Sequence, residues 1–223
     1  MFPPLYAVLD EDLLKMPAQR CARELASAGA ELIQYRAKHS SPRAYFEVCS
    51  NLTETLAGRD TRFSVRFIVN DRPDIAAMVG AGGVHVGQDD LPPDDARRVC
   101  GSGRWVGIST HTLEQVRAAA KTSADYIAVG PIFSTSTKEK PGAVVGTSFI
   151  REARKLTSKS IVAIGGITRE RAAEVYEAGA DSIAVIRDLL ETSDPAARVK
   201  EFLPLPNFHK TVRSEIRETR FAK

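Results

Sequence analysis

Eight short apolar runs, separated by longer segments with helical spacing, constrain the fold of this 223-residue chain more than any other feature. Strand-like and helix-like segments alternate from one end to the other, which is the pattern of βαβ units around a parallel sheet. Several runs are almost continuously apolar, as expected for strands that are buried on both faces. The expected strands are Leu5–Leu9, Glu31–Tyr35, Arg66–Asn70, Gly83–Val86, Trp105–Ser109, Asp125–Val129, Ile161–Ile164 and Ser182–Ile186.

The segments between these runs place apolar residues every three to four positions, which predicts amphipathic helices. Examples are Pro17–Ala28, Arg43–Leu56, Leu113–Lys121, Ser148–Leu156 and Arg169–Ala178. Eight units without a long insertion favour closure of the sheet. We therefore expect a single-domain (β/α)8 TIM barrel over residues 1–204, with an open doubly wound α/β sheet as the structural alternative.

The formal net charge of +3 is concentrated at the carboxyl end. Residues 207–223 hold five Lys or Arg and two Glu, so the rest of the chain is neutral. A neutral body with a short basic tail does not favour a nucleic-acid partner. Residues 205–223 are expected to form a disordered end or an arm outside the barrel, without a role in catalysis.

The cellular setting follows from three further observations. No apolar run approaches the roughly 20 residues that span a bilayer, so no membrane partner is expected. The first residues lack the basic and apolar regions of a signal peptide. Cys21, Cys49 and Cys100 form no close pair and are expected to be reduced thiols. These observations favour a cytoplasmic protein, and the sequence is compatible with a homo-oligomer.

Polar side chains follow the second, third and fourth expected strands, where a barrel of this kind carries its functional groups. Gln34, Arg36 and Lys38 alternate along an extended segment and therefore share a face. Asp71 and Asp90 follow neighbouring strands, and Mg²⁺ accepts one or two carboxylates beside water and substrate phosphate. The alternatives are a solvated strand exit for the first group, and helix capping or a turn for the two aspartates.

A second polar group follows the later strands. Ser109 ends the fifth run with a hydroxyl that is able to contact a ligand. The segment Ser134–Lys138 supplies hydroxyls and a lysine, which suit an anionic ligand, although a flexible surface loop has the same composition. The pair Gly165–Gly166 after the seventh strand allows backbone N–H groups to approach phosphate. His85 and His111 are not at metal-ligand spacing, so no zinc site is expected.

Six motifs stand in order along the chain: Gln-x-Arg-x-Lys, Asn-Asp-Arg, Gly-Val-His-x-Gly-Gln-x-Asp, Gly-x-Ser-x-His-Thr, Gly-Pro-x-Phe-x-Thr-x-Thr-Lys and Ile-Gly-Gly-Ile. The series resembles the thiamine phosphate synthase family over about residues 5–203. The resemblance implies a transferase that joins 4-amino-2-methyl-5-(diphosphooxymethyl)pyrimidine to a thiazole phosphate and releases diphosphate. It also implies Mg²⁺ as the cofactor, with these two phosphorylated small molecules as partners.

The same resemblance implies roles for individual residues. The pyrimidine diphosphate would be bound by Gln34, Tyr35, Arg36, Ala37, Lys38, Asn70, Ser109 and Lys138. Of these, Arg36, Lys38, Ser109 and Lys138 would take part in catalysis. The thiazole phosphate would be held by Thr135, Ser136 and Thr137, with Gly166, Ile186 and Arg187 completing its cradle. Asp71 and Asp90 would ligate Mg²⁺.

Some positions depart from the family pattern. Tyr35, Ala37 and Thr110 differ from the residues that are common there, and Arg187 stands where a small residue is frequent. Two rival functions remain at this point. One is a thiazole tautomerase, which has no diphosphate to ionise and no need of the two aspartates. The other is a barrel that binds a phosphorylated ligand without catalysis.

Overall fold

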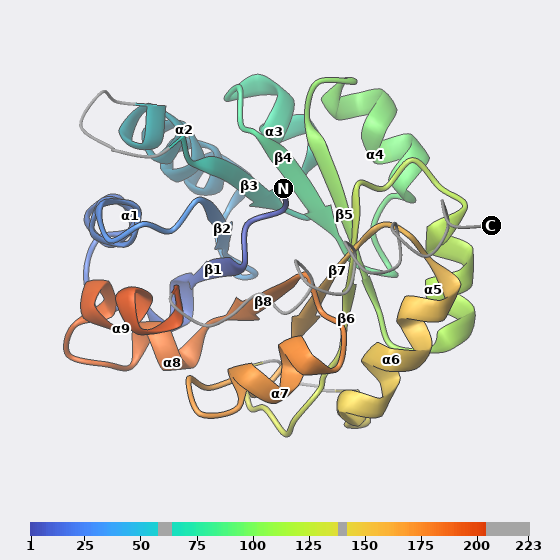
Figure 1. The fold of residues 1–223 in the computed structure, drawn as a ribbon. Helices are drawn as coiled ribbons and strands as arrows, with labels where there is room; N and C mark the ends of the chain where they lie inside the picture. The colour runs from blue at the N-terminus through green and yellow to red at the C-terminus, as the bar shows by residue number, and fades with distance from the viewer. Residues whose placement is uncertain (58–63, 138–141, 204–223) are drawn as a thin grey trace.

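The computed structural model describes residues 1–57, 64–137 and 142–203, and in these residues eight parallel strands form a closed barrel. Each strand pairs with the next one, and the last pairs with the first, so the open-sheet alternative is wrong. Figure 1 shows the strands in the middle of the molecule with the helices around them. The strands are β1 (Leu5–Asp10), β2 (Leu32–Arg36), β3 (Arg66–Asn70), β4 (Gly83–Val86), β5 (Trp105–Thr110), β6 (Tyr126–Val129), β7 (Ser160–Ile164) and β8 (Ser182–Val185).

Helices connect the strands on the outside of the barrel (Figure 1). They are α1 (Ala18–Ser27), α2 (Pro42–Ala57), α3 (Pro73–Met78), α4 (Pro93–Cys100), α5 (Leu113–Ala120), α6 (Gly146–Leu156), α7 (Ala172–Glu177), α8 (Arg187–Leu190) and α9 (Pro195–Phe202), with a 3-10 turn η1 (Glu11–Leu13) after β1. Most predicted helices agree within two residues at each end. The segment predicted as a helix over Arg169–Ala178 is helical only from Ala172.

Two apolar cores stabilise the barrel. One lies between the strands and the helices, and the other fills the barrel itself. The inner core consists of Tyr6, Val8, Leu32, Ile68, Tyr126, Ala128, Val162 and Ala184. Because alternate side chains of a strand point to opposite faces, each apolar run supplies both cores. The interior is therefore filled with side chains, and the open side of such a barrel lies towards the carboxyl ends of the strands.

The amino-terminal end of the barrel interior is covered by aromatic rings. Phe2 stacks on Trp105 with ring centroids 5.0 Å apart and an interplanar angle of 9°. The guanidinium of Arg66 lies 4.0 Å from the centre of the Trp105 ring on β5. A cation above an indole face adds electrostatic attraction to the stacking. This closure leaves the carboxyl ends of the strands as the open side.

The eighth strand differs from its prediction at its end. The extended run was expected to reach Ile186, but β8 ends at Val185. Ile186 has φ −118° and ψ −81°, which takes the backbone out of the extended conformation, and Arg187 begins α8. The side chain of Arg187 is therefore carried by a short helix at the rim rather than by the strand.

Other predictions are partly settled by the structure. The three cysteines are buried and unpaired, as expected. Within the described ranges, none of the helices has the length and apolar character that crossing a membrane requires. The predicted tail, residues 205–223, lies outside the described residues, so the proposed domain boundary stays a prediction.

Candidate active site

The carboxyl ends of the strands surround a cavity of about 1260 Å³. Its lining comes from the strands and from the segments after all eight of them, including Asp12 in η1 after β1. Most of the predicted site residues are among the lining residues: Gln34, Arg36, Lys38, Asn70, Asp71, Asp90, Ser109, Thr135, Ser136, Thr137, Gly166, Ile186 and Arg187. Residues that are far apart in the sequence are thus brought to one site.

Two of the predicted residues, Tyr35 and Ala37, are placed differently, and a third, Lys138, is not described. Tyr35 and Ala37 do not line the cavity, because alternate side chains of the extended β2 point to opposite faces. Gln34 and Arg36 face inward, whereas Tyr35 packs in the outer core. The side chains of Tyr35 and Ala37 thus do not line the cavity, and their part in substrate binding stays a prediction. Lys138 lies outside the described residues, and its role stays a prediction.

Asp71 and Asp90 lie beside each other at the rim after β3 and β4. The Asp71 N–H donates to the His85 carbonyl at 2.7 Å, and Asp90 Oδ2 accepts a bond from the Gly87 N–H at 2.7 Å. Lys38 forms an ion pair with Asp71. Burial raises the pKa of Asp71; Lys38 opposes this effect, and the nearby Asp90 carboxyl adds to it, so the net pKa direction is upward.

The two structural alternatives for the aspartates, helix capping and turn formation, have different outcomes. Asp71 does not cap α3, because the N-cap is Arg72 and makes no side-chain capping bond. Asp71 has a φ of 61°, a conformation that Asp and Asn adopt more readily than most residues. Asp90 does form a turn through its bond to Gly87. Among the described residues, no three His, Cys, Asp or Glu side chains are grouped as a metal site.

A buried carboxylate that is not among the predicted site residues contacts Arg36. Asp10, at the end of β1, is 2% exposed and forms an ion pair with Arg36 on the neighbouring strand. Its other oxygen accepts a bond from the Asp12 N–H at 3.2 Å. Part of the Arg36 charge is therefore compensated within the protein before any ligand binds. The acidic run Asp10–Asp12 after the first strand indicates carboxylates at this end of the barrel, but it does not indicate their partners.

A chain of polar side chains crosses the floor of the cavity. Gln34 Nε2 donates to Tyr6 Oη at 2.6 Å, and Tyr6 Oη lies 2.9 Å from Tyr126 Oη. His85 places Nδ1 3.1 Å from Tyr126 Oη and Nε2 2.9 Å from Ser109 Oγ. Burial raises the pKa values of Tyr6 and Tyr126, so both phenols keep their protons. Neither tyrosine is a predicted site residue, because in the sequence each has the pattern of an ordinary aromatic residue of a strand.

The loops after β6 and β7 are joined along their backbones on the opposite side of the cavity. The Ile132 N–H donates to the Ile164 carbonyl at 2.9 Å, and the Phe133 N–H to the Gly165 carbonyl at 3.0 Å. Gly166 follows with a φ of 61°, and a Cβ atom there would lie 2.9 Å from Phe133 Cβ. Glycine is thus required here both by backbone conformation and by the close approach of the two loops.

The hydroxyls of the β6 loop meet the helix that follows β8. Thr135 Oγ1 and Thr137 Oγ1 are 3.3 Å apart, and the Thr137 N–H donates to Thr135 Oγ1 at 3.4 Å. Arg187 Nε donates to Thr137 Oγ1 at 3.3 Å, and its guanidinium also forms an ion pair with Glu191. Hydroxyls, a glycine turn and a guanidinium therefore converge on one end of the cavity.

A closed (β/α)8 barrel with acidic and basic side chains at one end of its cavity, and hydroxyls with glycine at the other, defines an enzyme class that handles phosphorylated ligands. A family model described as thiamine monophosphate synthase matches residues 5–189. The chain belongs to this thiamine monophosphate synthase family.

Individual relatives agree with this assignment. The chain is 46% identical over 208 residues to a thiamine-phosphate synthase of Koribacter versatilis, covering 91% of this chain and 95% of the relative. It is 43% identical over 204 residues to one of Chloroflexus aurantiacus, covering 90% of this chain and 91% of the relative. A solved thiamine phosphate pyrophosphorylase of Pyrococcus furiosus has a TM-score of 0.78 and 32% identity, covering 89% of this chain and 93% of that chain.

Proposed function

We propose that this chain is a thiamine-phosphate synthase. It condenses 4-amino-2-methyl-5-(diphosphooxymethyl)pyrimidine with 4-methyl-5-(2-phosphooxyethyl)thiazole or a similar thiazole phosphate, giving thiamine phosphate and diphosphate. The observation that carries the proposal is a single cavity with two unlike ends. Lys38, Asp71 and Asp90 stand at one end, and Thr137 and Gly166 at the other. Such a cavity fits one diphosphate and one monophosphate substrate at the same time.

The diphosphate end combines opposite charges. Arg36 and Lys38 supply cationic donors, which would bind the diphosphate oxygens by charge-assisted hydrogen bonds. Asp71 and Asp90 would hold Mg²⁺, because two neighbouring carboxylates suit a hard cation. Burial, and after it the nearby Asp90 carboxyl, raises the pKa of Asp71, and a bound cation would offset both effects. The ion would neutralise negative charge that develops on the departing diphosphate. Lys38 would then exchange its bond to Asp71 for one to the substrate.

The monophosphate end uses neutral donors. The Thr135 and Thr137 hydroxyls and the backbone N–H groups around Gly166 would bind the thiazole phosphate. Arg187 would add one cationic donor from α8, in keeping with its bond to Thr137. Ile186 lines the cavity beside it and contributes apolar contact for the ligand.

The reaction requires positioning more than proton transfer. The bond from the pyrimidine methylene carbon to the diphosphate oxygen breaks, and its electron pair leaves with the diphosphate. The lone pair of the thiazole nitrogen forms the new carbon–nitrogen bond, so no proton moves and no general base is needed. The cavity would hold the two reactants in contact and stabilise the leaving charge.

The neighbouring Ser109 and His85 resemble a nucleophile and its base, which would suit hydrolysis. In a Ser–His–Asp arrangement a carboxylate orients the histidine. Here the second imidazole nitrogen lies beside the Tyr126 phenol instead. A phenol does not stabilise an imidazolium as a carboxylate does, which supports a binding role for Ser109 rather than a nucleophilic one.

The test is an incubation of purified protein with both phosphorylated precursors, with and without Mg²⁺, followed by chromatographic measurement of thiamine phosphate. We expect product only with both precursors, and more of it with Mg²⁺. A thiazole carboxylate phosphate offered alone tests the tautomerase alternative by its isomerisation. Binding of the thiazole phosphate without turnover in any metal condition would instead support a non-catalytic barrel and contradict the proposal.

The proposal also places the protein in the cytoplasm, which its three unpaired cysteines favour. Its partners would be the two phosphorylated small molecules. Cell fractionation with detection of the native protein tests the location.

A further inference from the structure

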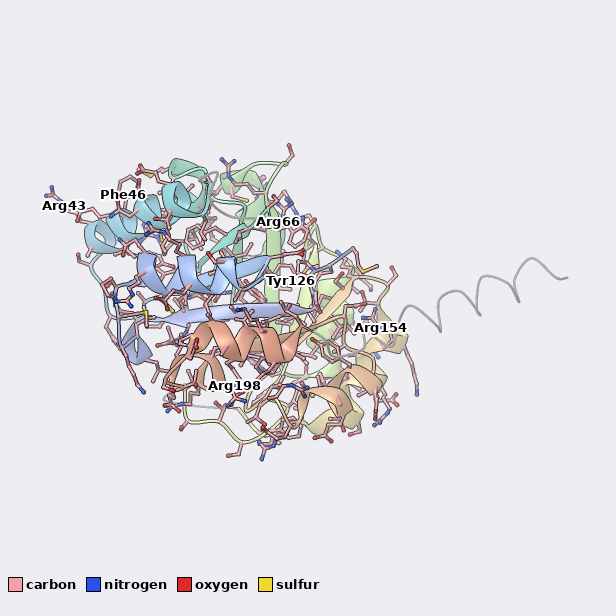
Figure 2. All side chains as sticks on the ribbon, turned by 60° about the vertical axis from the view of Figure 1, so that its left-hand side comes forward. Arg43, Phe46, Arg66, Tyr126, Arg154 and Arg198 are labelled. Carbon is pink, nitrogen blue, oxygen red and sulfur yellow. The ribbon has the colours of Figure 1, made fainter. Side chains whose placement is uncertain are left out.

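Three neighbouring strands bring His85, Gly107 and Tyr126 to the same level inside the barrel. In the sheet register, His85 on β4 pairs with Gly107 on β5, and Gly107 pairs with Tyr126 on β6. Because Gly107 has no side chain, the rings from β4 and β6 meet across β5, with centroids 5.5 Å apart and an interplanar angle of 23°. A Cβ atom at Gly107 would overlap the phenol ring of Tyr126, which Figure 2 labels in the middle of the molecule.

Two directions run continuously through the hydrogen bonds of this group. A mixed arrangement, in which Tyr126 accepts from both Tyr6 and His85, leaves the buried Tyr126 proton without an acceptor among the described residues. In the first direction, Tyr6 donates to Tyr126, and Tyr126 donates to His85 Nδ1. A neutral imidazole that accepts at Nδ1 carries its proton on Nε2, so it donates to Ser109 Oγ. In the second direction every bond is reversed, and Ser109 donates its own proton to His85.

The two directions differ in how deeply their terminal residues, Tyr6 and Ser109, are buried. Tyr6 Oη already accepts a bond from Gln34, so the second direction leaves the Tyr6 proton without a partner among the described residues. Tyr6 is 1% exposed, whereas Ser109 is half-buried and lines the cavity. A buried donor without an acceptor is costly, and a donor that faces the cavity is not. The first direction is therefore favoured.

We propose that Tyr126 is a positioning residue that holds His85 in the Nε2–H tautomer and thereby directs the Ser109 hydroxyl proton into the cavity. Gly107 permits this by leaving room for the phenol beside the imidazole. Ser109 then presents a donor to an oxygen or nitrogen acceptor of the bound substrate. Only this last step rests on the proposed function; the tautomer of His85 does not.

The direct test is ¹⁵N NMR of the histidine side chains, with the His85 signals identified from their loss in His85→Gln. In the wild-type protein we expect a protonated Nε2 and an unprotonated Nδ1. Tyr126→Phe keeps the ring but removes the donor, and it should shift the Nδ1 signal and mix the two tautomers. Tyr176→Phe is the matched control, because Tyr176 is also buried and donates elsewhere, to the Pro4 carbonyl at 2.7 Å.

Kinetics supply the second readout. Tyr126→Phe should lower kcat roughly five- to tenfold, the size of one neutral hydrogen bond, while Tyr176→Phe changes it less than about twofold. Tyr6→Phe should preserve the His85 tautomer, since Tyr126 still donates to Nδ1. An Nδ1–H tautomer in the wild-type protein would overturn the inference, even if Tyr126→Phe did not fold.

The outcomes separate the two proposals. If the wild-type protein makes no thiamine phosphate but His85 carries its proton on Nε2 and responds to Tyr126→Phe, the proposed function fails and the tautomer assignment stands. If product forms and the His85 signals do not respond to Tyr126→Phe, the function stands and the positioning role of Tyr126 is refuted.

Discussion

Asp10 on β1 and Arg36 on β2 are partners in the register of the two strands, and their side chains form an ion pair. The Asp10 carboxylate is almost completely buried. The side chain of Arg36 is 14% exposed and reaches the cavity. Burial of both charges is tolerated because each compensates the other. The pair thus fixes the guanidinium at the end of the cavity that we propose for the diphosphate before a ligand arrives, which would reduce the ordering cost of binding.

Removal of the Asp10 charge should therefore destabilise the fold. In Asp10→Asn the Arg36 charge remains largely buried without its partner, and we expect the free energy of unfolding to fall by about 3 kcal/mol. Urea denaturation with an unchanged m-value measures this difference. The control is Asp12→Asn, whose partner His39 lies 3.8 Å away and whose side chain is 55% exposed. Equal losses in the two variants would contradict a special role for the buried pair.

The ionised carboxylate of Asp71 should lower the free energy of unfolding at neutral pH. Its folded-state pKa lies above the ordinary value of 3.8, so the folded protein binds the proton more readily than the unfolded chain does. The free energy of unfolding therefore decreases as pH rises through the window that begins near 3.8. In metal-free buffer at pH 7, we expect Asp71→Asn to be more stable than the wild-type protein, with a difference that disappears on acidification. Turnover should fall by roughly a hundredfold, as for loss of a preorganised charge contact.

Asp74 supplies the control of opposite sign. The hydrogen bond from Arg72 lowers the pKa of Asp74, so this carboxylate stabilises the fold above its ordinary pKa. Asp74→Asn should lose a small amount of stability at pH 7, because the pair is partly exposed, and should regain parity as pH falls. Parallel denaturation series between pH 3.5 and 7 measure both trends. The same slope in both variants would contradict the assignment for Asp71.

The strands were predictable because burial on both faces requires continuous apolar runs, as in Ile161–Ile164. The positions of the polar site residues were predictable for a related reason, since polar groups can follow such runs only at the open rim. Because alternate side chains of a strand point to opposite faces, the inward direction of Gln34 and Arg36 in β2 was predictable. The same alternation explains why Tyr35 points away from the cavity. The end of β8 was not predictable, because nothing in Ile186 itself signals a change of backbone conformation.

The polar contacts beneath the cavity could not be read from the sequence. Asp10 and Arg36 are 26 positions apart, and their contact depends on the pairing register of β1 with β2. Tyr126 meets His85 only because Gly107 stands between them on a third strand. Such contacts depend on the alignment of neighbouring strands, which the residue pattern of any one strand does not specify.

Gly166 should be intolerant of a side chain. Its φ of 61° costs a non-glycine residue about 1–2 kcal/mol, and a Cβ would also press against the β6 loop. We expect Gly166→Ala to lower the free energy of unfolding by about 2 kcal/mol or more and to raise the KM for the thiazole phosphate. Gly103→Ala is the control, since a Cβ there meets no atom within 4 Å, and its change should stay within about 0.5 kcal/mol. A thiazole phosphate KM unchanged by Gly166→Ala would contradict the placement of the phosphate.

Arg187 and Glu191 allow a test in which two variants act in opposite directions. Arg187 divides its donors between Thr137 and Glu191, so the carboxylate competes with an incoming phosphate for the same guanidinium. Arg187→Ala should raise the KM for the thiazole phosphate roughly ten- to a hundredfold with little change in kcat, because a charge-assisted hydrogen bond contributes roughly 1.5–3 kcal/mol. Glu191→Gln removes the competitor and should lower the same KM. Steady-state kinetics with varied thiazole phosphate and saturating pyrimidine diphosphate measure both KM values. A KM that is raised by both variants would mean that the ion pair shapes α8 and that Arg187 does not bind the phosphate itself.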